Sequence, residues 1–269
     1  MPMEIEPLHH SHPAWLLQEQ FTFLRSLTEE EAGFGEIFQV RRRQTGEIYA
    51  LKIVKPAHEH AELALQMLVR EARILAEVQH GHLVRLLEDH SDGGHVLPHL
   101  LLEYVPGKSL DGFLKTRRSL RTRLRLSLGV TAAIAYLAEQ GWQHNDTHPR
   151  NVVVDERAEW PVLIDFGLAT KNDDPVDPAL LQHGFPGYTH PDILQGKPYT
   201  RTTQCFALTR TVAKILEDET LDPAVCGAAG EELQAALHQL EHGECDELRP
   251  LLAAVQRCLL YNLTCESNW

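Results

Sequence analysis

The chain has 269 residues, of which 43% are hydrophobic and 23% charged, and a formal net charge of −13 at pH 7. This length suits one large domain or two lobes rather than one small core, and the composition is that of a globular protein. The negative charge excludes nucleic acid as the main partner, and the lack of about 18 uninterrupted apolar residues excludes a membrane-spanning helix.

Charged residues are distributed unevenly along the chain. Ten acidic residues and no Lys or Arg lie from Leu216 to Leu248, and six basic residues and no acid lie from Lys115 to Arg125. Each run is most simply interpreted as a solvated helix face. Interpreted as functional surfaces, the acidic half would favour a basic partner, and the basic run would dock an acidic one.

The cysteines and histidines predict neither a disulfide framework nor a metal site. The five cysteines have no CxxC spacing, which favours reduced thiols in a cytoplasmic protein. The N-terminus carries no basic segment followed by an apolar run, so no secretory signal is expected. His9, His10 and His12 are interpreted as part of a solvated terminus rather than as metal ligands.

The N-terminal part of the chain is predicted to be rich in strands. After a lead-in with a short amphipathic helix near Trp15–Gln20, Phe21–Leu27 is typical of a strand. The segments Ile37–Val40 and Ile48–Val54 flank a polar turn, which predicts a β-hairpin. Lys52 interrupts the second of these apolar segments, so its side chain must reach an edge or a charged cleft.

A long helix and two further strands are expected next. Ala61–Val78 has helical periodicity and carries Glu71. Strands are expected within residues 79–90 and 95–105. The segment PGKSLDG that follows is rich in turn formers and is expected to be a loop that separates two lobes.

The remainder of the chain is predicted to be mainly helical. Helices are expected at Leu110–Lys115, Arg121–Gln140, Thr203–Leu216, Glu231–Leu240 and Leu248–Tyr261. Gly141 is well placed to end the second of them. Thr170–Pro198 is rich in Asp, Pro and Gly and is expected to be a loop.

One stretch, from Gln143 to Gly167, carries three side chains suited to a phosphoryl-transfer site. Asp146 lies five residues before Asn151, and Asp165 follows an apolar run. The pattern predicts a loop, a strand at 152–154, a turn and a strand at 162–164. Such a unit can gather three oxygen-bearing side chains around Mg²⁺. Any one of them alone would be interpreted as a surface residue in a turn.

Six stretches, in chain order, resemble the motifs of a eukaryotic-type protein kinase domain. They are TGEIYALKIV, REARILAEVQHGHLV, LLLEYVPGKSL, HNDTHPRN, IDFG and GFPGYTHPD, and the resemblance covers about residues 21–262. It implies an α+β, bilobal protein-kinase-like fold. A lead-in over 1–20 would precede a small strand-rich N-lobe with one long helix over 21–103 and a larger, mainly helical C-lobe over 104–269.

The resemblance also implies roles for individual residues. Asp146 would be the catalytic base, Lys52 held by Glu71 would grip the α- and β-phosphates of ATP, and Asn151 and Asp165 would hold Mg²⁺. The residues implied in binding ATP are Gly33, Phe34, Gly35, Ile37, Ala50, Lys52, Glu103 and Val105, with Leu102 in the gatekeeper position.

The glycine-rich loop departs from the family pattern. Glu30 and Ala32 stand where the first two glycines are usual, so only Gly35 remains of the three. An alternative register begins at Gly33. The first register is preferred because it gives Ile37 the place of the residue that covers adenine.

Five positions around the catalytic loop also depart from the pattern. Asn145 replaces the arginine that clamps a phosphorylated activation segment, so we expect activity without that phosphate. His148 and Phe185 replace a lysine and a threonine that contact each other and the catalytic Asp in serine/threonine kinases. Gln204 replaces an aspartate that braces the catalytic loop. Asp192 replaces a glutamate, and its usual arginine partner is missing near the end of the chain.

The favoured hypothesis is an ATP- and Mg²⁺-dependent protein kinase of the non-RD kind, which lacks the arginine before the catalytic Asp. It would act on a protein substrate, at Ser or Thr foremost, with a basic substrate favoured by the acidic charge. A kinase-fold phosphotransferase for small molecules is the second hypothesis, because the Lys–Thr pair is lost. A pseudokinase binding module is the third, because the glycine-rich loop is depleted and the bracing residues are altered.

Overall fold

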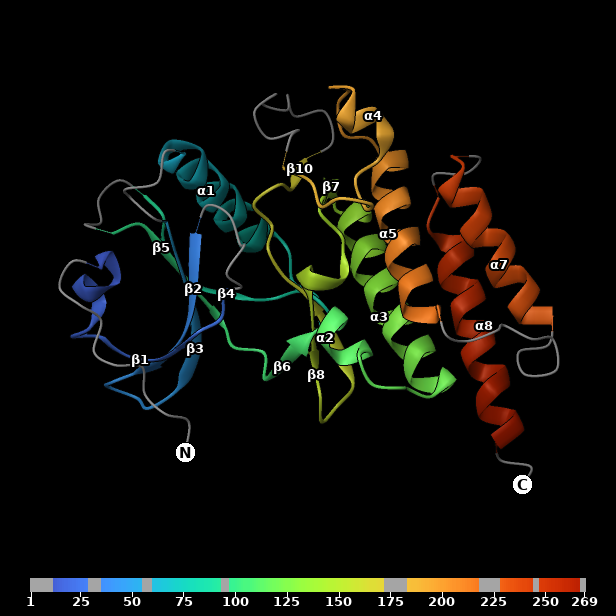
Figure 1. The fold of residues 1–269 in the computed structure, drawn as a ribbon, viewed down its shortest axis with the longest axis horizontal. Helices are drawn as coiled ribbons and strands as arrows, with labels where there is room; N and C mark the ends of the chain where they lie inside the picture. The colour runs from blue at the N-terminus through green and yellow to red at the C-terminus, as the bar shows by residue number, and fades with distance from the viewer. Residues whose placement is uncertain are drawn as a thin grey trace. The chain divides into compact units, whose positions relative to one another are not determined.

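The computed structural model describes residues 12–28, 35–54, 60–92, 97–171, 183–217, 228–243 and 247–266, with side chains up to residue 261. The chain forms two compact units, Met1–Gln79 with Val84–Val105, and His80–Leu83 with Pro106–Trp269. The first unit ends at Val105, whereas the N-lobe was predicted to end at Glu103. The short segment His80–Leu83 belongs to the second unit. An antiparallel sheet dominates the first unit and helices dominate the second, in agreement with a bilobal α+β fold (Figure 1).

The first unit contains a five-stranded antiparallel sheet in the order β1-β2-β3-β5-β4. The strands are β1 (Phe21–Ser26), β2 (Gly35–Arg42), β3 (Ile48–Val54), β4 (Leu86–His90) and β5 (His99–Glu103). Helix α1 (Ala61–Glu77) contacts β3, β4 and β5. The predicted first strand, hairpin and long helix are therefore confirmed.

A short 3-10 helix, η1 (Pro13–Leu17), packs on one face of this sheet. Pro13 occupies its first turn, where no backbone donor is needed, and the His12 ring caps it by accepting a hydrogen bond from the Ala14 amide. Ala14 and Leu17 are buried in one hydrophobic cluster with Phe21, Phe23, Phe38, Val40, Leu51, Ile53, Leu97 and Leu101. Burial of this apolar surface stabilises the sheet on that face.

The interpretation of His12 as part of a solvated terminus was wrong. Its Nε2 lies 2.9 Å from Oε2 of Glu36 on β2, and its ring packs edge-on against Phe38 with centroids 5.8 Å apart. The cause is η1, which anchors the residue before it to the sheet. His9 and His10 lie outside the described residues.

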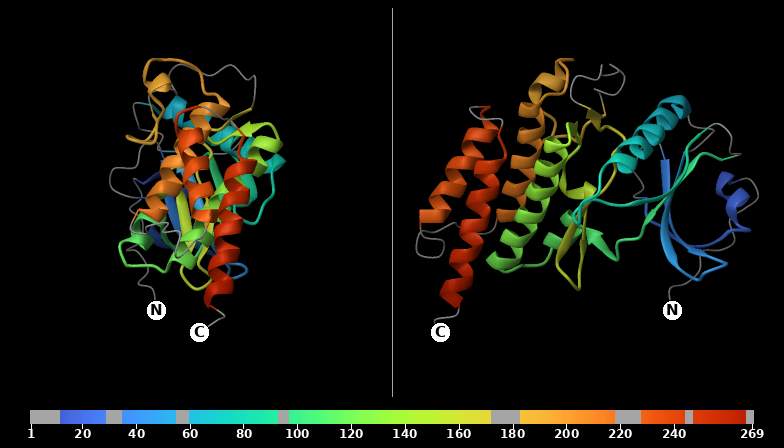
Figure 2. Two further views of the ribbon diagram at one scale, coloured as in Figure 1. Left: turned by 90° about the vertical axis from the view of Figure 1, so that its right-hand side faces the viewer. Right: turned by 180° about the vertical axis from the view of Figure 1, so that it is seen from behind.

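Long helices form the second unit. They are α3 (Leu120–Glu139), α5 (Arg201–Leu216), α7 (Ala228–Glu241) and α8 (Arg249–Glu266), preceded by the short helix α2 (Leu110–Leu114). Helix α3 contacts α5 and α8, and α7 contacts both of these, so that α7 and α8 lie side by side in both views of Figure 2. The Ser119 hydroxyl caps α3 by accepting from the Thr122 amide at 3.1 Å, and Gly141 follows the helix with a φ of 78°. The helices predicted in this part of the chain are confirmed.

The basic run Lys115–Arg125 is only partly a solvated face. Lys115, Arg117, Arg121 and Arg125 are exposed. Arg123 is 1% exposed and donates to the Ile215 carbonyl at 2.5 Å, so it joins α3 to α5. A buried charged group needs such a hydrogen-bonding partner, and this residue therefore serves the packing of the unit.

Two segments that were predicted to be loops contain short regular elements. PGKSLDG includes β6 (Gly107–Ser109), which forms a three-stranded sheet with β8 (Val152–Asp155) and β9 (Trp160–Leu163). A Cβ at Gly107 would overlap the Val154 carbonyl oxygen, so glycine serves a close strand contact here rather than a turn. Thr170–Pro198 includes β10 (Thr170–Lys171), paired with β7 (Trp142–Gln143), and α4 (Pro191–Leu194). Elements this short leave no periodicity in a sequence.

Within the described ranges, no helix has both the length and the apolar character needed to cross a membrane. Cys205 and Cys258 are buried thiols. The other three cysteines lie outside the described side chains.

Candidate active site

The first unit holds Lys52 and Glu71 in an ion pair. The Lys52 ammonium, on β3, donates to Oε2 of Glu71, on α1, over 2.5 Å. The Glu71 side chain is 1% exposed and that of Lys52 is 13% exposed, so solvent screens the pair weakly. This contact fixes the position of a cation that the resemblance assigns to the ATP phosphates.

Three other residues implied in ATP binding lie on the same sheet face as Lys52. The register pairs Ile37 with Lys52, and it pairs Ala50 with the buried Leu102. Cross-strand partners share a face, and side chains alternate along a strand. Ile37, Ala50 and Lys52 therefore project from one face, on the side where Gly35 also falls.

Gly35 begins β2 at the end of the expected glycine-rich loop. A Cβ at this position would lie 2.8 Å from the Ile53 carbonyl oxygen, so the contact between β2 and β3 requires glycine. Gly33 and Phe34 lie outside the described residues.

Glu103 ends β5 with its carboxylate bonded inside the first unit. Arg85 donates to this carboxylate from its backbone amide at 3.0 Å and from Nε at 2.8 Å. The Glu103 amide donates to the Arg85 carbonyl at 3.0 Å. Because the Glu103 side chain and amide both bond to Arg85, a contact of this residue with adenine would use its backbone carbonyl. Val105, the other residue implied here, is half-buried at the end of the unit.

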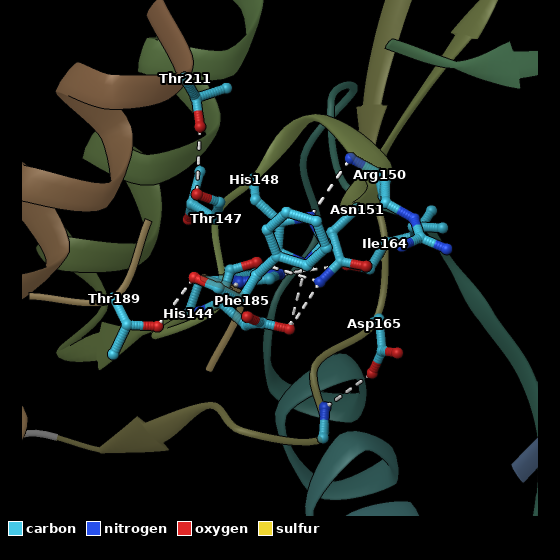
Figure 3. A network of polar contacts seen from close by, with 12 residues as sticks. His144, Thr147, His148, Arg150, Asn151, Ile164, Asp165, Phe185, Thr189 and Thr211 are labelled. Atoms are coloured by element: carbon cyan, nitrogen blue, oxygen red, sulfur yellow. Dashed lines mark hydrogen bonds and ion pairs between the residues drawn. The ribbon is translucent and has the colours of Figure 1, made fainter. Parts of the chain in front are cut away.

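In the second unit, the loop between β7 and β8 carries Asn151, which is labelled in Figure 3, and brings it together with Asp146. The Asn151 side-chain amide donates to the Asp146 carbonyl at 3.0 Å and to its Oδ2 at 2.8 Å. The Asn151 backbone is anchored by hydrogen bonds to His148 and Ile164, within the 3-10 turn η2 (Pro149–Asn151) and beside it. The Asp146 side chain remains 18% exposed, so a carboxylate held through one oxygen is still reachable.

His144 lies buried under this loop and is neutral. Its Nδ1 accepts a hydrogen bond from the Asp146 amide at 3.3 Å, so the proton is on Nε2, which lies 3.1 Å from the Ile164 carbonyl oxygen. Burial lowers the pKa of His144 to about 4, although the nearby Asp146 carboxylate acts in the opposite direction. His144 therefore orients the loop and carries no charge at neutral pH.

The lowered pKa of His144 predicts a loss of stability in mild acid. The ordinary pKa is 6.5 and the folded-state pKa about 4, so the unfolded chain binds more protons between these values. The stabilisation is complete above pH 6.5 and is lost as the pH falls toward 4, on the order of 3 kcal/mol in all. Urea unfolding of the wild type and of His144→Gln between pH 7 and 4.5 measures it. The wild-type slope should be steeper by about one proton, and equal slopes would contradict the assignment.

Gln204, on α5, supports the loop between β7 and β8. Its Oε1 accepts a hydrogen bond from the His144 backbone amide at 2.7 Å, and the residue is 2% exposed. The resemblance implies an aspartate at this position. Glutamine is uncharged, but its Oε1 still accepts the hydrogen bond of the His144 amide.

Gln204→Met is expected to lower the free energy of unfolding by about 1–3 kcal/mol, because it leaves the buried His144 amide without its acceptor. The same exchange at Gln195, which is exposed at the end of α4, is the matched control and should change stability by less than about 0.5 kcal/mol. Chemical unfolding of both variants is the measurement. Equal effects at the two positions would show that the hydrogen bond contributes nothing.

Asn145, in the loop between β7 and β8, is linked to the segment after Asp165 by hydrogen bonds of its uncharged side chain. Its backbone is left-handed, with a φ of 66°, which is uncommon for a residue other than glycine. Its side-chain amide donates to the Leu168 carbonyl at 2.9 Å and to the Thr170 hydroxyl at 2.8 Å. The resemblance implies an arginine at this position. Asn145 instead holds the start of the segment, at Leu168 and Thr170, and needs no phosphate group to do so.

Asp165 and Asn151 offer the oxygen atoms that Mg²⁺ prefers. Asp165 also has a left-handed φ, of 61°, and its Oδ1 accepts a hydrogen bond from the Gly167 amide at 3.2 Å. The Asn151 amide group is used on Asp146, so its side-chain oxygen is the atom left for a cation. No group of three or more His, Cys, Asp or Glu side chains within the described ranges could hold a metal ion. Mg²⁺ usually needs only one or two protein carboxylates beside phosphate and water oxygens, so these residues fit it.

At two other places where the resemblance implies a contacting pair of residues, this chain forms a contact of another kind. The rings of His148 and Phe185 stack with centroids 4.2 Å apart. Asp192, for which the resemblance implies an arginine partner, accepts a hydrogen bond from the Lys197 ammonium at 2.6 Å, and this bond lowers the pKa of the Asp192 carboxyl.

Sequence reasoning missed the supporting roles of His144 and Thr211. His144 stands two residues before Asp146 in the H-x-D pattern, so that pattern could have identified it. The Thr211 hydroxyl, on α5, donates to the Thr147 carbonyl at 3.0 Å across 64 positions of the chain. Thr211 lies in an apolar helical run, and no local pattern marks it.

Comparison with known proteins finds a matching family and several relatives. Residues 31–244 match the family described as protein kinase domain. The chain is 27% identical over 213 residues to dual specificity testis-specific protein kinase 2 of Rattus norvegicus, covering 76% of this chain and 36% of that protein. It is 28% identical over 199 residues to dual specificity testis-specific protein kinase 1 of Homo sapiens, covering 71% and 30%.

A further relative is serine/threonine-protein kinase sgk-1 of Caenorhabditis elegans. The identity is 27% over 191 residues, which cover 66% of this chain and 38% of that protein. The chain thus spans about a third of the length of the curated relatives it matches.

Proposed function

Because the chain belongs to the protein kinase domain family, we propose that it transfers the γ-phosphoryl group of ATP to a hydroxyl group of a protein, that of serine or threonine foremost. The observation that carries this proposal is the Asp146 carboxylate, which Asn151 holds through one oxygen at 2.8 Å while the side chain stays partly exposed. The relative named a serine/threonine-protein kinase supports the acceptor class.

Asp146 acts on the attacking hydroxyl. With Oδ2 engaged by Asn151, the other carboxylate oxygen accepts the hydrogen bond of the substrate hydroxyl and orients its oxygen toward phosphorus. The hydroxyl proton passes to this carboxylate as the new oxygen–phosphorus bond forms and the bond to ADP breaks. The Asn151 side chain that donates these hydrogen bonds is uncharged, so the Asp146 carboxylate keeps its negative charge.

The remaining residues position charge around the phosphates. Lys52 binds the α- and β-phosphates, and Glu71 keeps its ammonium in one place. Asn151 and Asp165 would hold Mg²⁺, which when bound neutralises charge on the phosphate oxygens. Catalysis of this kind depends mainly on positioning, which explains why so many hydrogen bonds converge on the loop from His144 to Asn151.

We further propose that the activity needs no phosphate on the segment after Asp165. The support is Asn145, whose neutral bonds to Leu168 and Thr170 already tie that segment to the catalytic loop. Treatment of the purified protein with a broad phosphatase, followed by its removal, should leave kcat within about twofold of the starting value. A loss of most activity that returns after incubation with Mg-ATP would contradict the proposal.

Phosphosite mapping tests the proposed function. The wild type is incubated with Mg-ATP and a basic protein such as histone or myelin basic protein, and the modified residues are identified by mass spectrometry. Phosphoserine or phosphothreonine that disappears in EDTA and returns with added Mg²⁺ is the expected result. Phosphotyrosine alone would overturn the acceptor class, and unmodified substrate with unchanged ATP would overturn the activity.

A further inference from the structure

We propose that His148 is a positioning residue for Asp146 and that its position depends on Phe185, so that the seating of the segment Gly184–Thr189 controls the catalytic base. This inference rests on the proposed function. It concerns two positions at which the chain departs from the usual lysine and threonine.

The ring of His148 is oriented toward Asp146. Its Nδ1 accepts a hydrogen bond from the Arg150 amide at 3.3 Å, which places the ring proton on Nε2. Nε2 lies 3.4 Å from Oδ2 of Asp146, the same oxygen to which Asn151 donates at 2.8 Å. The His148 side chain is 7% exposed, so little water competes for this contact. Asn151 therefore holds this carboxylate oxygen by a hydrogen bond, the His148 ring lies beside it, and the other oxygen is turned away from both.

Phe185 fixes the plane of the His148 ring. The two rings are nearly parallel, at 18°, with centroids 4.2 Å apart, and Figure 3 shows Phe185 lying over His148. The Arg150 guanidinium lies 5.6 Å from the centroid of the same phenylalanine ring. An imidazole can rotate about its side-chain bonds, and a stacked aromatic neighbour restricts that rotation. The direction of the Nε2–H group thus depends on where Phe185 lies.

The position of Phe185 is set by its own segment. The Phe185 carbonyl accepts hydrogen bonds from the amides of Tyr188 and Thr189, each at 3.1 Å, and from the Thr189 hydroxyl at 3.0 Å. A Cβ at Gly184 would overlap the Thr189 hydroxyl, so this turn also requires its glycine. A segment closed on itself in this way moves as one body, and Phe185 carries that movement to His148.

The orientation of the Asp146 carboxylate therefore depends on the position of the segment Gly184–Thr189. When Gly184–Thr189 is seated, Phe185 stacks on His148 and Asp146 is held by two partners. When the segment leaves, Asn151 alone remains on the carboxylate, and the fraction of time in the productive orientation falls. Lys52, which would bind ATP, is held by Glu71, so the affinity for ATP is not expected to follow this change.

A double-mutant cycle on kcat tests the coupling. His148→Lys and Phe185→Thr should each lower kcat roughly tenfold, with the KM for ATP unchanged, because each removes the stack. The double variant should recover most of the loss, because lysine and threonine can form a hydrogen-bonded pair of their own. Phe185→Tyr keeps the ring and should retain activity. A double variant whose loss is the product of the two single losses would overturn the coupling, as would equal losses for Phe185→Thr and Phe185→Tyr.

Two controls separate this inference from the proposed function. His80 stacks on Tyr136 at 5.1 Å outside the catalytic loop, and His80→Lys should leave kcat unchanged. The same cycle is measured on the thermal unfolding midpoint, which needs no activity. Non-additive midpoints support the contact even if the wild type transfers nothing, and additive midpoints overturn it. Transfer by the wild type with an additive cycle on kcat would refute the inference and leave the proposed function standing.

Discussion

Asp146→Asn is expected to lower kcat for protein phosphorylation by about a thousandfold, within the range of 10²–10⁴ that a positioned general base contributes. Asparagine can still accept a hydrogen bond from Asn151, so the loop should keep its shape. It cannot take the proton of the substrate hydroxyl. The KM for ATP should change little, because Glu71, on α1, holds the Lys52 ammonium by a hydrogen bond that this substitution leaves in place.

Asp111→Asn is the matched control for this experiment. Asp111 lies exposed in the first turn of α2, and the same exchange there should leave kcat within about twofold. Initial rates at saturating ATP, with unfolding curves for both variants, complete the measurement. Transfer by Asp146→Asn at the wild-type rate would remove Asp146 from the chemistry.

Lys52→Met is expected to have the second largest effect, on both stability and ATP affinity. The substitution leaves Glu71, whose side chain is 1% exposed, without the ammonium that donates to it. Loss of one partner from a buried pair costs about 3–5 kcal/mol, so the free energy of unfolding should fall by that order. The loss of a cation at the phosphates should also raise the Kd for ATP by at least about tenfold.

Lys108→Met provides the contrast, because Lys108 forms an ion pair with Glu156 at 2.8 Å while its side chain is 60% exposed. Such a surface pair contributes about 0–1 kcal/mol, and its loss should be barely measurable. Urea unfolding and nucleotide titration of both variants give the comparison. An equal loss of unfolding free energy in the two variants would contradict the interpretation that burial makes the Lys52–Glu71 pair contribute more than the Lys108–Glu156 pair.

The long elements and the short-range motif could be predicted from the sequence for a physical reason. Helices such as α1 and α3 bury one face, which leaves a repeating apolar pattern, and α3 also carries its signals Ser119 and Gly141 at the two ends. Asp146 and Asn151 meet because a tight loop joins them, so their spacing alone carries information about their contact.

Contacts between distant positions could not be predicted in this way. The bond from His144 to Gln204 joins residues 60 positions apart, and the residue type alone indicated only an altered brace. The structure shows that a neutral side chain supplies the acceptor. The strand β6 was missed for a related reason, because Gly107 is typical of a turn and its real role, a close approach to Val154, appears only in the folded chain.

A common feature connects the positions where this chain departs from its family. Asn145 for arginine, Gln204 for aspartate, and His148 with Phe185 for lysine with threonine all remove formal charge around Asp146. Each retains a contact in neutral or aromatic form. The loop is therefore held by hydrogen bonds and stacking, which salt screens less than ion pairs. The kcat at saturating ATP and substrate should accordingly depend little on ionic strength.

Transfer of radiolabel from ATP to protein tests the central claim most directly. The wild type and Asp146→Asn are incubated in parallel with a basic protein, Mg²⁺, and ATP labelled at either the γ- or the α-phosphate. The proposed function predicts label in the protein from γ-labelled ATP only, dependent on Mg²⁺, with the variant reduced by about a thousandfold. Label transferred equally by both proteins, or no label from γ-labelled ATP with the wild type, would contradict it.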